Sequence, residues 1–326
     1  MDDTLIQPSL FELLARTWPL EGAVAALAFN HAETAVVFAT ADGRAAVMAL
    51  ADAETPGKRV RIEFDTGRTT IRPRVNPVPA PTLVGPLTEG RAPLLTAFGA
   101  QGFCLAAGDG SLHRVTARGQ SLRFTPADPA PITALAGHKD SEEVAVARGT
   151  ALALLDATGA ATAAARLDGP VGVMAVSPDG RVLAVGDDGG VSLLDATAGL
   201  LPLRRVALGA GVLSLVWDPA GQTLAAGCDD RSAAVVNLAA GAAEPVHRLG
   251  GFPESPQSLA ITRTPPALIA GGTYRVAAWA LGADRPDPMK TGRAGLVLVD
   301  RVAANPARKV VAAGYASGLV LLAHLG

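Results

Sequence analysis

Short apolar runs separated by turn residues follow one another along the chain, and residues 171–195 show this pattern most clearly. The runs are Val171–Val176, Val182–Val185 and Val191–Leu194. A Ser-Pro-Asp-Gly turn joins the first two runs, and Asp188-Gly189 offers a hairpin turn before the third. The pattern predicts three short antiparallel strands that are apolar on both faces. Such a sheet cannot bury both faces alone, so it must stack on copies of itself.

Copies of this unit occur seven times in the chain. The turn after the first strand falls at Asn30, Gly99, Gly137, Ser177, Asp218, Arg263 and Asn305. The spacing is roughly 38–45 residues in all but one interval, in line with the repeat length of propeller blades. Because no helical period separates the strands, the sequence predicts an all-β, seven-bladed β-propeller with four-stranded antiparallel blades, in one domain covering residues 1–326. The blades are expected to start near residues 23, 92, 131, 170, 211, 256 and 296.

The beginning of the chain is predicted to complete the last blade. Arg16–Leu20 lies at the same distance before Val24 as Arg204–Leu208 lies before Val212. The last unit ends after its third strand, so an N-terminal strand would pair with it and remove an exposed sheet edge. A short helix with Ser9 as N-cap and Glu12 in a capping box is the alternative for the start, and both can hold if the helix comes first.

One interval between units is longer than the others by about 29 residues. Arg59–Phe64 is interpreted as the outer strand of the first blade, which places an insertion at residues 65–93, between blades 1 and 2. Its high proline content favours extended chain over regular strand pairing. The insertion should share a face of the ring with the Asp188-type turns, and deletion of residues 66–90 is expected to leave the fold intact.

Charge and composition limit the environment and the partners. The net charge of −2 gives no general attraction to nucleic acid or to anionic lipid, so neither is predicted as a partner. The apolar runs are shorter than the roughly 18 residues that a membrane span needs, and the start lacks the basic region of a signal peptide. We therefore expect a cytoplasmic protein without a membrane segment. Cys104 and Cys228 lie three units apart and are predicted to be reduced.

The segments SPDG, GDDGGVSLLD, DPAGQTLAAGCDD and AVVNL resemble the WD40 repeat, and the resemblance covers essentially the whole chain. Leu194-Asp195 and Val236-Asn237 stand where that repeat ends in Trp-Asp, whereas its Gly-His pair is absent. The resemblance assigns a structural role in the second turn to Asp42, Asp109, Asp188 and Asp229. Without the histidine, the buried network typical of the family is not expected. The degenerate match is similar to stand-alone bacterial WD40-like proteins, which implies an interaction platform or an accessory to a metal-handling or GTP-dependent chaperone system.

The sequence contains no recognisable catalytic or metal-binding pattern. The five histidines fall in different units, and no nucleophile elbow, P-loop or His-Glu-x-x-His motif occurs. Asp187 and Asp230 remain after the turn residues are assigned, and two carboxylates are too few to argue for Ca²⁺. We therefore predict no catalytic residue, no cofactor and no metal.

Candidate partner-binding residues lie near the insertion and in two turns. The insertion candidates are Arg59, Arg61, Arg68, Arg72 and Arg74, accompanied by Lys58. Arginine suits pairing with carboxylates and is enriched at interfaces, although a solvated loop would show the same composition. Tyr274 and Tyr315 fall in the same turns of units six and seven and are candidate aromatic contacts, with ordinary exposed tyrosines as the alternative.

The predicted function is that of a non-catalytic, monomeric scaffold that binds a partner protein through one ring face and the insertion. The alternative is an enzyme or small-ligand binder that uses the central channel. That alternative needs polar side chains on the inner strands, and the segments VAALAF, LLTAF, VGVMAV, LSLVW and SLAIT are nearly all apolar.

Overall fold

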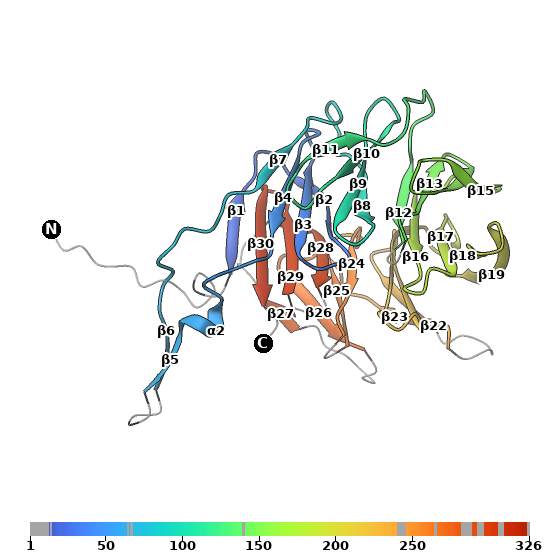
Figure 1. The fold of residues 1–326 in the computed structure, drawn as a ribbon. Coiled ribbons are helices and arrows are strands. Elements are labelled where there is room, and N and C mark those ends of the chain that lie inside the picture. Colours follow the sequence, from blue (N-terminus) through green and yellow to red (C-terminus); the bar gives the residue numbers. More distant parts are fainter. Residues whose placement is uncertain are drawn as a thin grey trace.

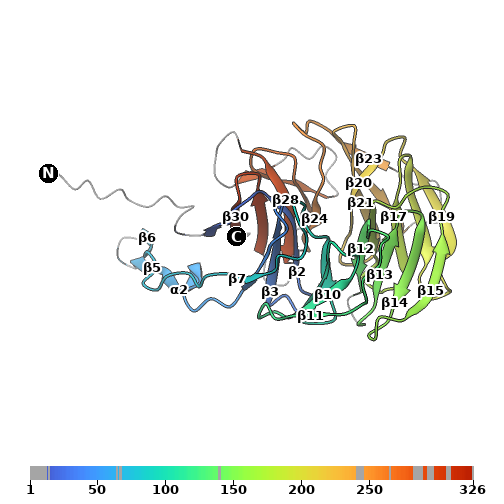
Figure 2. The same ribbon diagram turned by 90° about the horizontal axis from the view of Figure 1, so that it is seen from above.

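The computed structural model describes residues 13, 15–63, 65, 68–138, 141–239, 246–263, 266–281, 289–291, 297–305 and 310–324. Seven four-stranded antiparallel sheets stand around a central axis, as Figures 1 and 2 show from the side and from above. The prediction of an all-β, seven-bladed propeller is confirmed. The helix predicted at Ser9 and Glu12 lies outside the described residues.

The blades follow the chain from the inner strand outward. Blade 1 contains β2 (Val24–Phe29), β3 (Ala35–Thr40), β4 (Ala45–Ala49) and β7 (Thr82–Val84); blade 2 contains β8 (Leu95–Phe98), β9 (Gly102–Ala106), β10 (Leu112–Val115) and β11 (Ser121–Arg123). Blade 3 contains β12 (Ala134–Gly137), β13 (Val144–Arg148), β14 (Ala151–Leu155) and β15 (Ala161–Arg166); blade 4 contains β16 (Val173–Val176), β17 (Val182–Gly186), β18 (Gly190–Asp195) and β19 (Leu201–Ala207). Blade 5 contains β20 (Val212–Trp217), β21 (Thr223–Cys228), β22 (Ala233–Asn237) and β23 (Val246–Leu249); blade 6 contains β24 (Leu259–Ile261), β25 (Ala267–Ala270), β26 (Val276–Ala280) and β27 (Met289–Thr291). Blade 7 contains β28 (Val299–Asn305), β29 (Val310–Tyr315), β30 (Leu319–His324) and, from the other end of the chain, β1 (Arg16–Pro19).

The hydrophobic core lies between neighbouring blades, because each second strand is buried on both faces. In β3, for example, all six residues are buried, and the residues of β21 pack against β17 and β18 of the preceding blade. Small residues allow the blades to approach closely. A Cβ on Gly227 would lie 2.0 Å from the Pro256 carbonyl oxygen, so this contact between blades 5 and 6 has room only for glycine.

The first and last strands close the ring as predicted. β1 pairs antiparallel with β30, from Arg16 opposite Leu322 to Pro19 opposite Leu319. The Trp18 side chain is buried in the cluster between blades 7 and 1. Its Nε1–H donates a hydrogen bond of 3.0 Å to the Pro79 carbonyl oxygen. The seam of the ring is therefore held by backbone pairing and by side-chain packing.

The insertion differs from the prediction in its bounds and in its face. β5 (Val60–Glu63) pairs with β6 (Arg68–Ile71) as a separate hairpin, and the outer strand of blade 1 is β7. The predicted outer strand at Arg59–Phe64 and the predicted insertion at 65–93 are therefore wrong. The inserted chain runs from residue 51 to residue 81, between the third and outer strands. The strand β7 was not predicted because the surrounding sequence is rich in proline. Proline is nevertheless compatible with a short edge strand when it lies beside the strand and not within it.

The corrected position moves the insertion to the other side of the ring. We call the side with the turns between second and third strands the upper face and the opposite side the lower face. β4 starts at an upper turn and ends at the lower face, where the insertion begins. The predicted shared face with the Asp188-type turns is therefore wrong. Deletion of residues 66–90 would also remove β7, so it cannot leave blade 1 intact.

Candidate functional site

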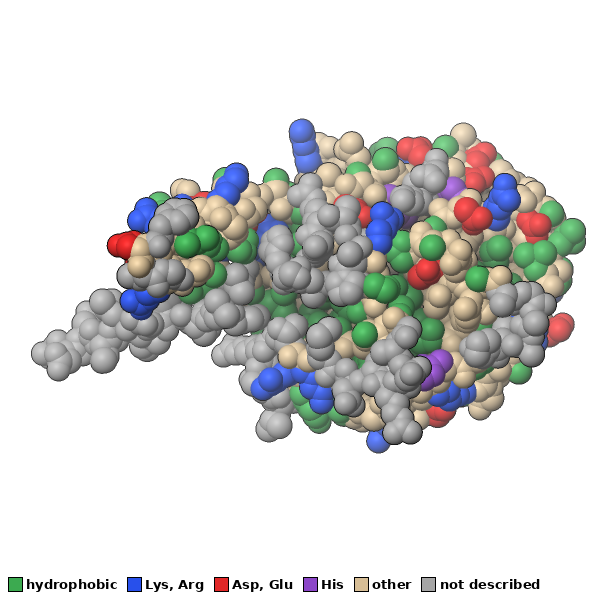
Figure 3. All heavy atoms as spheres, turned by 90° about the horizontal axis from the view of Figure 1, so that it is seen from below, with side chains coloured by type: hydrophobic (Ala, Val, Ile, Leu, Met, Phe, Trp, Pro, Cys, Tyr) green, Lys and Arg blue, Asp and Glu red, His purple; other side chains and the backbone are tan. Residues whose placement is uncertain are grey.

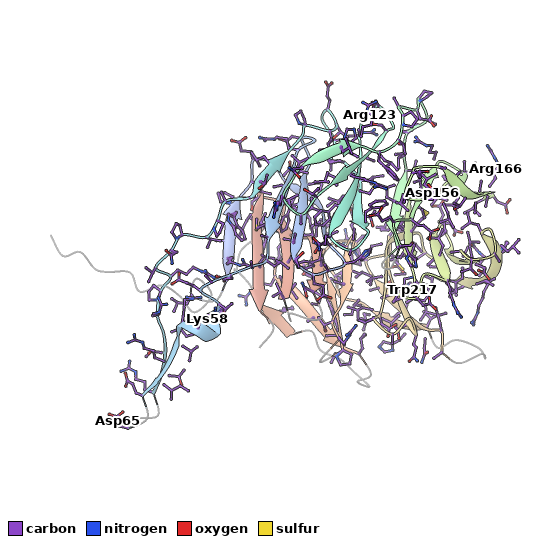
Figure 4. All side chains as sticks on the ribbon, in the orientation of Figure 1. Lys58, Asp65, Arg123, Asp156, Arg166 and Trp217 are labelled. Atoms are coloured by element: carbon purple, nitrogen blue, oxygen red, sulfur yellow. The ribbon has the colours of Figure 1, made fainter. Side chains whose placement is uncertain are left out.

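The insertion forms an arm beside the ring, which we define as residues 51–81. It contains the short helix α2 (Pro56–Arg59) and the hairpin of β5 and β6. Seen from below, the arm is a separate lobe that carries blue cationic and green hydrophobic side chains (Figure 3). Lys58 lies nearer the ring and Asp65 at the outer end (Figure 4). The hairpin tip therefore stands away from the blades.

Ion pairs and hydrogen bonds connect the two ends of the arm. The Arg74 guanidinium donates to both oxygens of Asp52, at 3.0 Å to Oδ1 and 2.6 Å to Oδ2. This partner lowers the pKa of Asp52 to about 2. Glu54 accepts hydrogen bonds from the backbone N–H groups of Val75 and Asn76, at 3.1 and 3.0 Å. The base of the arm is thus a fixed structure and not a loose loop.

Arg59 also holds the base of the arm together, and its buried side chain is not accessible to a partner protein. Its side chain is buried, with a relative exposure of 1%, and burial lowers its pKa. Nε donates to the Glu54 carbonyl and Nη1 to the Arg72 carbonyl, both at 3.0 Å, and Nη2 donates to the Leu13 carbonyl. Arg72 in turn pairs with Glu54 at 3.3 Å.

Three of the five arginines assigned to partner binding therefore hold the arm together. The assignment of Arg59 and Arg74 to partner binding is wrong, because backbone carbonyls and the Asp52 carboxylate bind them within the arm. Arg72 pairs with Glu54, but its side chain is 38% exposed, so its assignment stays a prediction. Sequence spacing could not show which acid faces which arginine. Arg61 and Arg68 lie on the exposed hairpin.

The hairpin has one apolar and one polar face. Its pairs are Val60–Ile71, Arg61–Thr70, Ile62–Thr69 and Glu63–Arg68. Because side chains alternate along a strand, Val60, Ile62 and Ile71 share one face with a threonine, and both arginines lie on the other. Ile62 is 56% exposed. A large apolar side chain exposed near a hairpin tip, with cations on the opposite face, is the geometry of a contact element.

The two tyrosines are not equivalent. Tyr315 ends β29 and is buried, at 2% exposure, in the cluster between blades 6 and 7, so its assignment as a partner contact is wrong. Tyr274 lies in the turn before β26 and is exposed. The sequence placed Tyr315 in a turn because β29 extends one residue further than the apolar pattern indicates.

The upper-face turns are held by aspartates, although not always by the predicted one. Asp109 accepts hydrogen bonds from the backbone N–H and the hydroxyl of Ser111, at 3.0 and 2.6 Å, and pairs with an arginine of the outer strand. In blade 4 the equivalent bonds are made by Asp187, which accepts from two backbone N–H groups and pairs with Arg205. No hydrogen bond of the Asp188 side chain is found among the described residues, so the turn role of Asp188 is wrong.

The remaining turn aspartates each have partners. Asp42 accepts a 2.5 Å hydrogen bond from the Thr40 hydroxyl. Asp229 accepts a 3.0 Å hydrogen bond from the Gly211 backbone N–H. Asp230 takes the position of Asp109 in blade 5 and pairs with Arg248 at 3.0 Å. Asp187 and Asp230, which the sequence analysis left without a role, are thus structural.

The seven inner strands surround a cavity of about 620 Å³. Most of its lining is alanine, leucine and valine, as the inner-strand sequences predict. Arg301 of β28 is an exception that the sequence analysis missed, because the inner strand of the seventh unit was not weighed. An Asp-Arg pair at positions 300–301 of an otherwise apolar strand was the available signal.

Metal-ligating side chains, cysteines and helices provide no further candidate functional site within the described ranges. Among those residues, no three His, Cys, Asp or Glu side chains gather closely enough to hold a metal. Both cysteines are free and buried. None of the described helices has the length and apolar character that crossing a membrane requires.

Residues 206–237 match the family described as WD domain, G-beta repeat. The matched segment holds the end of β19 followed by β20, β21 and β22. The matched repeat thus begins in the outer strand of blade 4 and continues through the first three strands of blade 5. In the same way, β1 is the outer strand of blade 7, and the chain continues from it into blade 1. A search of the curated proteins found no match. The matched repeat and the closed ring of seven four-stranded blades together support a WD40-like β-propeller.

Proposed function

We propose that the chain is a non-catalytic, monomeric scaffold that binds a partner protein through the hairpin of its arm. WD40 propellers commonly act as interaction scaffolds. The observation that carries the proposal is the contrast between the two parts of the arm. The base is fixed by buried Arg59 and by the Asp52–Arg74 pair, whereas Ile62 at the outer part is exposed.

A free two-stranded hairpin is marginally stable in water. Packing and ion pairs at the base hold this one in a defined position, which reduces the entropy that a partner must overcome when it binds. The ring itself does not need the hairpin, since β5 and β6 pair with each other and with no other described strand. Interaction is therefore the function that the construction of the arm supports best.

The hairpin surface indicates the chemistry of the partner. Ile62 offers an apolar anchor, and Lys58, Arg61 and Arg68 are exposed cations that outnumber the anions Glu63 and Asp65. We expect a partner protein that contacts both faces of the hairpin, with an apolar pocket for Ile62 and carboxylates for the arginines on the opposite face. Arginine pairs with such carboxylates in a bidentate geometry.

The test shortens the hairpin and leaves its base in place. Residues 61–70 are replaced by Asn-Gly, a two-residue turn that can join Val60 to Ile71, which face each other across the hairpin. Affinity purification from the native cell with mass spectrometry compares this variant with the wild type. We expect an unchanged melting temperature of the ring and loss of the partner.

Point variants distinguish the loss of a contact with the partner from the loss of the fold. Ile62→Asp should lose the partner, whereas Leu122→Asp on β11, where the leucine is 71% exposed, should keep it. Equal recovery of the partner with the shortened hairpin and with the wild type would disprove the assignment of the arm.

A further inference from the structure

Arg301 occupies an unusual position at the upper end of the central channel. It lies near the start of β28, and the first strand of each blade runs from the upper to the lower face. Leu213 of β20 lines the same end of the channel and is 39% exposed. The upper mouth therefore combines one cationic side chain with an apolar wall.

The guanidinium of Arg301 is fixed but has no ion-pair partner among the described residues. Nε donates to the Ala25 carbonyl, Nη1 to the Asp300 carbonyl at 3.0 Å, and Nη2 to Gln257 Oε1 at 3.2 Å. These bonds use three of the five N–H donors of arginine. Burial lowers the pKa of Arg301, and the nearby charge of Asp300 offsets only part of this effect. The site thus holds a poorly solvated cation with two donors left.

The repeat itself does not require an arginine here. Strand register shows that Ala26 in blade 1 and Ser214 in blade 5 occupy the equivalent position, directly after the irregularity in the inner strand. The Ser214 hydroxyl donates a 2.7 Å hydrogen bond to the Pro256 carbonyl of the next blade. A serine therefore suffices to connect neighbouring blades at this position, and the charge and reach of Arg301 need another explanation.

We propose that the upper mouth of the channel binds a carboxylate with an apolar body, the carboxylate on the free N–H groups of Arg301 and the apolar part against Leu213. Arginine presents paired donors that match a carboxylate. A single guanidinium balances one negative charge, which fits a carboxylate better than a phosphate dianion. The cavity volume of about 620 Å³ lies in the range of ligand pockets. This site is distinct from the hairpin, so the two proposals stand or fall separately.

Calorimetric titration of the full chain tests the proposal with defined probes. The probes are octanoate, 1-octanol, inorganic phosphate, and an N-acetylated Ala-Leu-Ala-Leu peptide with either a free or an amidated C-terminus. We expect octanoate or the free-acid peptide to bind and the uncharged forms to bind at least tenfold more weakly. Octanoate binding alone identifies a small acid as the ligand type, and binding of the free-acid peptide alone identifies a peptide terminus.

Two variants assign the binding to the mouth. Arg301→Ser introduces at this position the hydroxyl that Ser214 has in blade 5, and it should weaken binding about 10- to 100-fold, the loss expected for a charge-assisted hydrogen-bond pair. Leu213→Asp, at a partly exposed position, should weaken binding as well, and it provides the test if Arg301→Ser fails to fold. The proposal is wrong if neither acid binds the wild type at 10 mM, if phosphate or octanol binds as well as the acids, or if binding survives both substitutions.

Discussion

Replacement of Trp18 by alanine should open the seam of the ring. The side chain is 7% exposed and packs in the cluster between blades 7 and 1. A buried tryptophan removes about 200 Å² from water, which at about 25 cal/mol per Å² is worth about 5 kcal/mol as an upper value. We expect Trp18→Ala to lower the free energy of unfolding by about 4 kcal/mol, within the usual range for such truncations.

Calorimetry converts this loss into a temperature. An unfolding entropy of about 2.1 cal/mol/K per residue gives a chain of 326 residues a shift of about 1.5 °C per kcal/mol, so the melting temperature should fall by about 6 °C. Trp18→Phe is the matched control, because it keeps most of the apolar area and loses mainly the hydrogen bond to Pro79, worth about 1 kcal/mol. If Trp18→Ala and Trp18→Phe melt within about 1 °C of each other, the seam does not depend on this packing.

Urea unfolding should show that Asp187→Asn costs about 1 kcal/mol and Asp188→Asn less than about 0.5, because the turn hydrogen bonds belong to the former. Gly227→Ala should lower the melting temperature through a steric cost of about 1–3 kcal/mol, whereas Gly169→Ala, with no atom within 4 Å of the new Cβ, should change it little. The pKa of Asp52 is lowered from 3.8 to about 2, so its stabilising effect is complete above pH 3.8 and disappears as the pH falls toward 2. The difference in melting temperature between wild type and Asp52→Asn should shrink over that interval.

The sequence predicted what depends on local pattern and periodicity. Seven units of short apolar strands imply stacking, and the matching distances before Val24 and Val212 locate β1. The sequence could not predict features that depend on the pairing of strands far apart in the chain. β7 is three residues long between prolines, and only its pairing with β4 distinguishes it from loop.

The candidate sites show the same limit. An arginine cluster in sequence indicates a basic surface, but the contacts of Arg59 with backbone carbonyls, and the pairing of Arg74 with Asp52, exist only in the folded arm. Burial of Tyr315 depends on packing against the neighbouring blade. Arg301 was visible as a charge in an apolar strand, yet its lack of an ion-pair partner among the residues that the structure describes is a property of the assembled channel.

The arm and the seam of the ring form one structural unit. Arg59 donates to the Leu13 carbonyl, Arg16 donates to the Leu50 carbonyl at 3.4 Å, and Trp18 donates to the Pro79 carbonyl at 3.0 Å. Leu13 and β1 are therefore bonded to Arg59 and Pro79 of the arm and to Leu50, the residue that precedes the arm. A partner that binds only the folded arm must also favour the closed ring, because ligands that bind the native state stabilise it in proportion to their affinity. The position of the arm beside the seam thus couples partner binding to the one place where the ring can open.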